Sequence, residues 1–349
     1  MSFLKNLKPH KVVVDAFNYK FCLAGRPKTG KTSLLYGIVK EKFNGDLSKL
    51  LLIAFEKGYN ALDGIYAKDI NTWKEFQELV DELIEYKDEI PFRILGFDTV
   101  DIMAKLATEY IIKQQARKDG KKYETIADIP YGKGYDLLES EMAKQITKLD
   151  KAGFSLFFIT HDKDKQFETR EGLKYDKTTL SLSGRVRDLI LNMVDFIIFI
   201  EIGKEREGTT LVDKRWIYFR GDSSLEAGSR FKHVPERIEY SYKGFLQAIE
   251  DAIAKEYNND TNAMQKAMEE QNKRREEEAK KFIEQEKNKM TAEEMIQEIT
   301  KLVTPLDDQT KIKIAKKFKE ILGDANYMNA TDEEALVEAL EFVKSVIAE

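Results

Sequence analysis

Gly25–Arg26–Pro27–Lys28–Thr29–Gly30–Lys31–Thr32 matches the pattern GxxxxGK[ST] in full. The motif follows the apolar run Phe21–Ala24 and precedes a helical pattern over Ser33–Phe43, which is the strand–loop–helix context that a phosphate-binding loop requires. Its glycines let successive N–H groups point inward, and the helix N-terminus adds partial positive charge. We therefore predict an ATP site in which Lys31 meets the β- and γ-phosphates and Thr32 holds Mg²⁺. The predicted nucleotide-binding residues are Gly25, Arg26, Pro27, Lys28, Thr29, Gly30, Lys31, Thr32 and Ser33.

Working outward from this loop, short apolar runs alternate with helical patterns up to about residue 260. The helical patterns include Thr72–Tyr86 and Tyr135–Lys151. Apolar strands that alternate with helices predict an α/β fold with a mostly parallel sheet between helices. The runs expected to form strands are Phe21–Ala24, Leu50–Phe55, Ile94–Phe97, Ser155–Ile159, Phe196–Ile200 and Trp216–Phe219.

Two carboxylates are predicted at strand ends near this loop. Asp98 ends the run that begins at Ile94, where a carboxylate organises Mg²⁺ through its water shell. Many ring ATPases place a glutamate directly after this aspartate, but here the next residue is Thr99. We predict that Glu56, at the end of Leu50–Phe55, orients the attacking water. A helix-capping or surface role for Glu56 remains the alternative.

Thr160 and His161 follow another apolar run, Ser155–Ile159. Polar side chains at strand ends of such sheets lie at the carboxyl edge, where ligands bind. We therefore predict that Thr160 and His161 sense the γ-phosphate and transmit its state to the following loop. A single histidine also occurs as a hydrogen-bonded structural residue, and this alternative stays open.

Composition excludes several classes of protein. The 349 residues carry 57 Lys+Arg and 62 Asp+Glu, a net charge of −5. The single cysteine, Cys22, excludes a disulfide framework and a Cys-rich zinc site. There is no apolar run of about 18 residues, and the N-terminal segment lacks a secretion signal. We expect a cytoplasmic protein that has no membrane partner.

Charge and periodicity divide the chain into three parts. We predict an ATPase core over residues 1–260, a charged helical connector over 261–290 and a small acidic helical bundle over 291–349. The last part holds 7 Lys/Arg and 13 Asp/Glu, which argues against direct contact with DNA. Thr291 with Glu294, and Thr331 with Glu334, form capping-box patterns that open two of its helices.

Taken together, these motifs resemble the RecA-like core ATPases, and most closely the minimal phage-encoded recombinases of the single-strand-annealing group, a family of phage nucleotide-binding or AAA-type ATPases. The resemblance covers roughly residues 10 to 250, and its specificity depends on the whole ordered set of motifs. Those motifs are Gly25–Thr32, Glu56–Lys57–Gly58, Phe97–Asp98–Thr99, Tyr131–Gly132–Lys133–Gly134, Ile159–Thr160–His161–Asp162–Lys163, Ala227–Gly228–Ser229–Arg230 and Pro235–Glu236–Arg237–Ile238.

This resemblance implies that ATP binds between neighbouring subunits of a ring or filament that handles single-stranded DNA. It implies a homo-oligomer in which Glu56 activates water and Arg230 reaches a neighbour's γ-phosphate, with Arg220 and Lys232 as alternatives. The family is phage-encoded, so the expected location is the bacterial host cytoplasm. For residues 291–349 three roles stay open, namely docking of a single-strand-binding protein, self-assembly and solubility.

Two regions are expected to contact DNA in the RecA-like pattern. The first runs from Arg117–Tyr123 to Tyr131–Gly134 and joins cations, aromatics and glycines. The second, His161–Arg187, holds seven cations and, with the adjacent Asp188, six anions, which is not a strong electrostatic signal. Cations neutralise phosphates and aromatic rings stack on bases, so both regions favour single-stranded DNA as a partner. Two solvated loops without a ligand are the alternative.

The main hypothesis is therefore an ATP-dependent single-stranded-DNA recombinase or annealing protein with ATPase activity. A DNA helicase or translocase built on the same core is the first alternative. A small-molecule kinase and a nucleotide-gated scaffold without DNA activity are the others.

Overall fold

The computed structural model describes residues 9–182, 184–330 and 333–348, which form two compact units. The first, called here the core unit, contains the chain up to Thr108 together with Asp136–Ile283. The second unit contains Glu109–Tyr135 and the chain from Glu284 onward. The predicted domain boundaries at residues 260 and 290 stay predictions.

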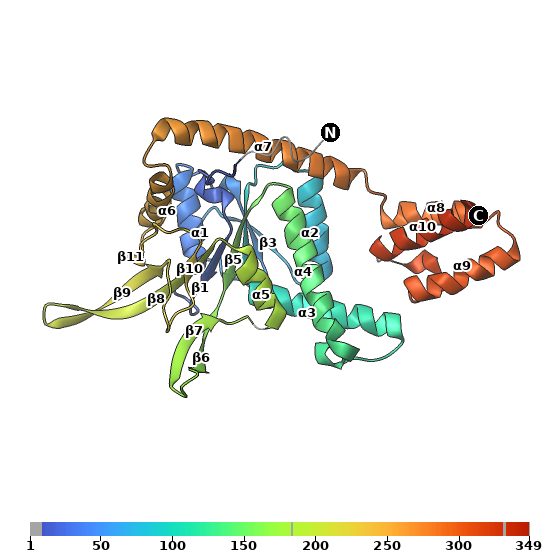
Figure 1. Ribbon diagram of the computed structural model, residues 1–349, viewed down its shortest axis with the longest axis horizontal. Helices are drawn as coiled ribbons and strands as arrows, with labels where there is room; N and C mark the ends of the chain where they lie inside the picture. Colours follow the sequence, from blue (N-terminus) through green and yellow to red (C-terminus); the bar gives the residue numbers. More distant parts are fainter. Residues whose placement is uncertain (1–8, 183, 331–332, 349) are drawn as a thin grey trace. The chain divides into compact units, whose positions relative to one another are not determined.

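The core unit is built on one large sheet with the strand order β11-β9-β8-β1-β5-β4-β2-β3, and β10 pairs with β8 (Figure 1). The pairs among β8, β1, β5, β4, β2 and β3 are parallel, whereas β9, β10 and β11 join antiparallel. This mostly parallel sheet confirms the predicted fold class. The strands are β1 (Phe21–Ala24), β2 (Leu50–Ala54), β3 (Tyr66–Asp69), β4 (Ile94–Asp98), β5 (Ser155–Thr160), β8 (Phe196–Glu207), β9 (Thr210–Tyr218), β10 (Gly228–Ser229) and β11 (Arg237–Glu239).

Strand β1, which leads into the phosphate loop, lies in the middle of this sheet. Phe21 pairs in register with Phe157 of β5 and with Phe196 of β8, and their rings stack at centroid distances of 4.6 and 4.8 Å. Every residue of β1, β2, β4 and β5 is buried, as expected for parallel strands covered on both faces. The loop is therefore anchored on one of the most buried parts of the chain.

Helices cover both faces of the sheet. Helices α1 (Lys31–Lys42) and α6 (Tyr242–Glu256) pack on one face, where Leu35 and Ile249 join the strands in one apolar cluster (Figure 1). Helices α2 (Trp73–Glu85) and α4 (Lys133–Lys151) lie on the other face, where Phe76 of α2 contacts Phe97 of β4. Helices α3 (Val100–Asp119) and α5 (Gly184–Met193) follow β4 and β7 in the chain.

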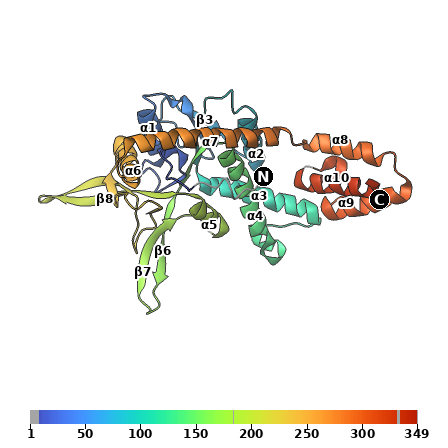
Figure 2. The same ribbon diagram turned by 45° about the horizontal axis from the view of Figure 1, so that its top comes forward.

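Two antiparallel hairpins project from the core unit (Figure 2). One consists of β6 (Asp162–Glu168) and β7 (Lys174–Leu180) and begins directly after His161. The other is the outer part of β8 and β9, which extends past the end of β1. Neither projection was predicted from the sequence as a strand pair, because their residues are mostly polar or charged and bury no continuous apolar run.

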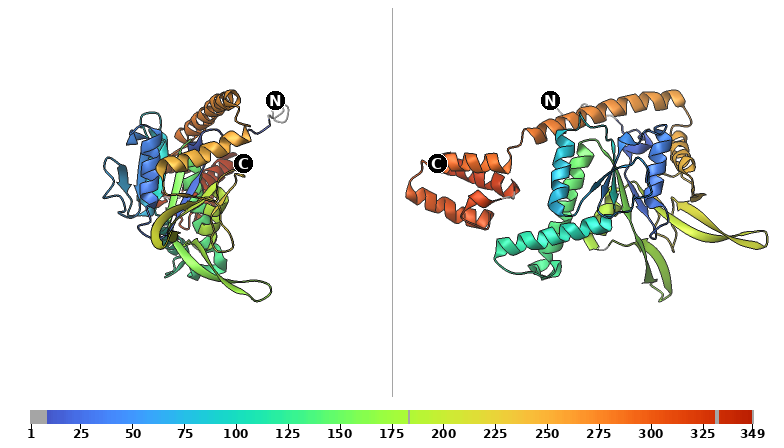
Figure 3. Two further views of the ribbon diagram at one scale, coloured as in Figure 1. Left: turned by 90° about the vertical axis from the view of Figure 1, so that its left-hand side faces the viewer. Right: turned by 180° about the vertical axis from the view of Figure 1, so that it is seen from behind.

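Helix α7 (Thr261–Lys287) occupies most of the segment expected to be a solvated connector, but one of its faces is buried against the core unit (Figure 3). Ala267 and Ile283 are buried, and the Arg275 guanidinium donates to the carbonyl oxygens of Asn18 and Phe154 at 3.4 and 2.9 Å. Burial lowers the pKa of Arg275. Because Asn18 and Phe154 precede β1 and β5, α7 crosses the amino ends of the strands.

The second unit contains the C-terminal helical bundle, whose helices are α8 (Ala292–Val303), α9 (Asp308–Ile321) and α10 (Glu333–Ala348). Phe318, Leu336 and Val343 lie in its buried cluster. The capping box of Thr291 and Glu294 is present at the start of α8, whereas the predicted box of Thr331 with Glu334 falls outside the described residues. Short 3₁₀ helices cover Ala16–Asn18, Leu47–Lys49, Ile126–Asp128, Pro130–Gly132 and Tyr327–Asn329.

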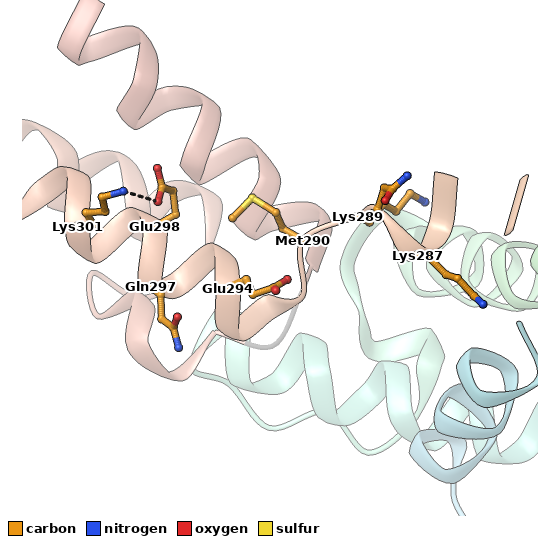
Figure 4. A pocket seen from close by; sticks show the side chains of 8 residues that line it. Lys287, Lys289, Met290, Glu294, Gln297, Glu298 and Lys301 are labelled. Carbon is orange, nitrogen blue, oxygen red and sulfur yellow. Dashed lines mark ion pairs between the residues drawn. The ribbon is translucent and has the colours of Figure 1, made fainter. Parts of the chain in front are cut away.

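A hollow of about 560 Å³ lies at the junction between the end of α7 and α8 (Figure 4). Its wall is mostly charged and amide side chains, and Lys301 pairs with Glu298 at 3.6 Å within it. None of its residues belongs to the predicted nucleotide site. The lining residues are Lys287, Asn288, Lys289, Met290, Glu294, Gln297, Glu298 and Lys301.

Candidate nucleotide-binding and hydrolysis site

The phosphate loop connects β1 to α1 through two glycines in conformations that other residues rarely adopt. Gly25 has φ +150°, and a Cβ at this position would lie 2.4 Å from the carbonyl oxygen of Ile200 on β8. Gly30 has φ +99° and caps α1. Arg26, Pro27 and Lys28 are exposed at the top of the loop, while Thr29 is buried and donates to the Arg26 carbonyl at 2.9 Å. Residues with side chains at the two glycine positions would disrupt the loop.

The Lys31 ammonium group lies in the centre of the loop. It donates to the carbonyl oxygens of Gly25 and Arg26 at 2.7 and 2.9 Å, and it lies 3.4 Å from Nδ1 of His161. Burial lowers the pKa of Lys31, whereas the carboxylates of Asp98, Asp162, Glu56 and Asp101 act in the opposite direction. Lys31 therefore places a cation inside the loop at the start of α1, where backbone N–H groups also favour a polyphosphate ligand.

Thr32 and Asp98 meet beside Lys31. The Thr32 hydroxyl donates to Oδ2 of Asp98 at 2.8 Å, and Asp98 is 2% exposed at the tip of β4. Burial raises the pKa of Asp98 to about 6, opposed by the Thr32 hydrogen bond. Hydroxyl and carboxylate oxygens are the ligands that Mg²⁺ prefers. The pair therefore fits the predicted metal role, in which Thr32 would hold Mg²⁺ and Asp98 would organise its water shell.

Glu56 lies at the same edge of the sheet as Asp98. The backbone N–H groups of Phe55 and Glu56 donate to the Asp98 carbonyl oxygen at 2.7 and 3.1 Å. Oε1 of Glu56 lies 3.7 Å from Nε2 of His161, whose other ring nitrogen faces Lys31. His161 thus bridges the ammonium group and the carboxylate. The structure brings Lys31, Thr32, Glu56, Asp98 and His161 together, and their catalytic roles stay predictions.

Thr160 is oriented differently from His161. Its hydroxyl is buried and donates to Oδ2 of Asp101 at 2.8 Å, and Asp101 also accepts the backbone N–H of His161 at 3.2 Å. Ser181, which follows β7, donates to the other Asp101 oxygen. Sequence reasoning missed Asp101 and Ser181, although Asp101 lies only three residues beyond Asp98. This network fixes the backbone at His161. The Thr160 side chain therefore helps to position His161.

Arg230 lies away from the site of its own chain. It follows β10, which pairs with the beginning of β8, so it lies at the amino edge of the sheet, opposite the phosphate loop. Its guanidinium pairs with Asp195 at 3.3 Å and remains 63% exposed. Arg220 donates to the carbonyl oxygens of Phe231 and Lys232. These positions supply no cation to the chain's own phosphate loop, and a role toward a neighbouring subunit stays a prediction.

Comparisons with known proteins show the family of this chain. A family model described as an AAA domain matches residues 17–231. The chain belongs to this family. It is 25% identical over 253 residues to the SPbeta prophage-derived uncharacterized protein YorG of Bacillus subtilis (strain 168), covering 70% of this chain and 73% of that protein. A solved KaiC-like protein from Pyrococcus horikoshii OT3 is 12% identical, with a TM-score of 0.32, and the match covers 64% of this chain and 90% of that chain.

The family match extends from the residues before β1 to Phe231 and includes every residue of the Lys31–Asp98–His161 cluster. Together with the phosphate loop and the strand order, it identifies the core unit of this AAA domain protein as a RecA-like P-loop NTPase. Nucleotide binding is the property that this fold supports directly. Within the described residues, no helix combines the length and apolarity needed to cross a membrane.

Proposed function

We propose that this protein is an ATP-dependent single-stranded-DNA-binding recombinase or annealing protein. It hydrolyses ATP with Mg²⁺ at the phosphate loop and works as a homo-oligomer, a ring or filament. The observation that carries the DNA part of the proposal is the β6–β7 hairpin, which begins directly after His161 and separates its charges between two faces.

One face of the hairpin is basic and aromatic. Successive residues of a strand point to opposite faces, and the register pairs Lys165 with Lys177 and Phe167 with Tyr175. The two rings stack at 5.9 Å and each side chain is 38% exposed. Two lysines placed directly opposite each other repel, and neither has an ion pair among the described residues. Stacked rings beside unpaired cations suit exposed bases and their phosphates.

The other face of the hairpin is acidic and contacts the phosphate loop. Asp164 accepts from Thr178 across the hairpin at 2.8 Å and pairs with Arg26 of the loop at 3.0 Å. Asp162 and Asp176 belong to the same face by register. The positive and negative charges of the β6–β7 hairpin therefore nearly cancel in sum, although they are divided between a basic face and an acidic face. The hairpin offers a physical link between the nucleotide and DNA.

Hydrolysis is assigned to the groups gathered at the carboxyl edge. Lys31 would neutralise the β- and γ-phosphates, while Thr32 and Asp98 would hold and organise Mg²⁺, which when bound supplies positive charge to the transferring phosphoryl group. Glu56 orients and polarises the attacking water, and His161 holds the Glu56 carboxylate near Lys31. Each of these side chains is held by a strand end or by the start of α1.

The proposal is tested by measuring ATP turnover with and without oligothymidylate at low salt. We expect the oligonucleotide to stimulate turnover and the double variant Phe167→Ala/Tyr175→Ala to weaken DNA binding by about 5- to 100-fold, since each stacked base contributes about 1–3 kcal/mol. Leu173→Ala is the matched control, because Leu173 is an exposed apolar residue of the same hairpin segment. Wild-type protein that neither binds the oligonucleotide nor responds to it contradicts the proposal, and a scaffold or kinase then fits better.

Two parts of the proposal concern partners. The homo-oligomer would use exposed Arg230 toward a neighbouring subunit's γ-phosphate, and the second unit would dock a single-strand-binding protein. Light scattering with and without ATP measures the first. If Arg230→Ala keeps the assembly but slows turnover, and if mixing it with the Lys31→Ala variant restores part of that turnover, Arg230 acts in trans. Full turnover by Arg230→Ala contradicts the role.

A further inference from the structure

Arg215 lies beside the phosphate loop, although no sequence motif marks it. It belongs to β9 and pairs in register with Ile202, just beyond the β8 residues that flank β1. One of its terminal nitrogens, Nη1, lies only 3.0 Å from the point where a Cβ of Gly30 would stand. The guanidinium is therefore packed against the residue that opens α1, where backbone N–H groups face a bound phosphate.

Tyr240 fixes Arg215 in this position. The backbone N–H of Tyr240 donates to the Arg215 carbonyl oxygen at 2.8 Å, and the Arg215 guanidinium lies 4.8 Å from the centre of the Tyr240 ring. The Tyr240 hydroxyl donates to the Gly30 carbonyl oxygen at 2.8 Å, and burial raises the pKa of this hydroxyl. Tyr240 thus connects the arginine and the loop through two different groups.

Arg215 differs from its neighbours in having no acidic partner. Lys204 pairs with Asp213, Lys214 with Glu207, and Arg237 with Glu205 on the same strands. Among the residues that the structure describes, no carboxylate lies within ion-pair distance of Arg215, which is half-buried. Its contact with the Tyr240 ring leaves the positive charge of the guanidinium without a counter-charge, and such a cation beside a phosphate loop indicates an anionic ligand.

The order of the strands in the sheet indicates which phosphates of the nucleotide Arg215 would contact. Glu56, Asp98 and His161 come from β2, β4 and β5, which lie on one side of β1, and they define the γ-phosphate end. Arg215 comes from β9, on the opposite side of β1. We propose that Arg215 binds the α- and β-phosphates of the nucleotide, with Tyr240 as its positioning residue. This inference rests on the nucleotide site of the proposed function.

The test compares ADP and ATP binding, with Mg²⁺, for wild-type protein and Arg215→Ala by calorimetry. We expect the variant to bind ADP and ATP more weakly by the same factor, about 10- to 100-fold, as for loss of a charge-assisted contact. At saturating ATP its kcat should change by less than about 3-fold, because the γ-phosphate groups are intact. Lys204→Ala, which removes a cation from the same hairpin, should bind both nucleotides normally.

Three results would overturn the inference. If Arg215→Ala binds ADP as tightly as wild-type protein does, Arg215 does not contact the α- and β-phosphates. If only ATP affinity or only kcat falls, Arg215 acts on the γ-phosphate instead. Thermal unfolding of the nucleotide-free variant separates ligand binding from a structural role: a Tm well below that of wild-type protein contradicts direct phosphate binding, whereas an unchanged Tm supports it. If wild-type protein binds neither nucleotide, the proposed function itself fails, and that failure is visible without any variant.

Discussion

Removing the two opposed lysines of the β6–β7 hairpin should weaken DNA binding without weakening the fold. Lys165 and Lys177 face each other in register on the face that carries the stacked aromatic pair. Each cation that neutralises a phosphate of single-stranded DNA contributes about 0.7 to the slope of log affinity against log salt. The double variant Lys165→Ala/Lys177→Ala should therefore lower this slope by about 1.4, which corresponds to roughly 25-fold in affinity at 0.1 M salt. Removal of the repulsion should leave the free energy of unfolding equal or up to ~1 kcal/mol higher.

The assay is fluorescence anisotropy of a labelled oligothymidylate over a series of salt concentrations, with urea unfolding of the same proteins. Lys174→Ala is the matched control, since Lys174 lies on the same hairpin but its register puts it on the acidic face. The reasoning is refuted if the control lowers the salt slope as much as the double variant does. An unaltered slope in the double variant refutes it equally, because the basic face would then make no phosphate contacts.

Further predictions concern the nucleotide site, its link to the hairpin and the core. Lys31→Ala should lose nucleotide binding, whereas Glu56→Gln should keep it and lose about 10²- to 10⁴-fold in turnover, measured by phosphate release; normal turnover by Glu56→Gln removes it from the mechanism. Asp164→Asn breaks the ion pair with Arg26, so DNA should stimulate ATP turnover of this variant less than that of wild-type protein, while basal turnover stays within about 3-fold. Equal stimulation of the variant and the wild-type protein contradicts a link between the phosphate loop and the hairpin. Lys87 is buried without a hydrogen-bond partner, and burial lowers its pKa to about 7; the unfolded chain therefore binds more protons between pH 7 and 10, and stability should rise with pH in this window. Lys87→Met should flatten that rise and increase the free energy of unfolding at pH 7 by ~4 kcal/mol in urea titrations, and an unchanged pH dependence would contradict this.

The central strands were predictable from the sequence because they are buried on both faces. Phe21–Ala24 agrees with β1 at both ends, and the predicted run from Leu50 differs from β2 by one residue. Strand β3 was missed because it lies at the edge of the sheet and alternates between exposed and half-buried residues. The buried face of α7 was missed for a different reason: it uses Arg275, which reads as a solvated cation until its backbone partners are known.

The residues of the site also differ in how far the sequence predicts them. Lys31 was predicted from the GxxxxGK[ST] motif, and Asp98 and Glu56 were predicted because a parallel sheet brings the carboxyl ends of its strands to one edge. The structure places the three side chains together around His161 and Thr32. The strand-end rule could not find Asp101 or Arg215. Asp101 lies on helix α3, and Arg215 lies within β9, which joins the sheet antiparallel. The charge of the hairpin could be summed from the sequence but not divided between faces, because that division requires the register of β6 with β7.

The size of the Arg26–Asp164 contact limits how strongly one subunit can couple ATP to DNA. The two side chains are 71% and 54% exposed, and exposed ion pairs contribute about 0–1 kcal/mol. Coupling is reciprocal, so breaking this pair on nucleotide binding changes DNA affinity by at most about 5-fold, and DNA changes nucleotide affinity by the same factor. Stronger coupling needs either movement of His161, which touches Lys31 and precedes the hairpin, or several subunits that bind one strand together. The two routes separate experimentally, because only the second depends on the length of the oligonucleotide.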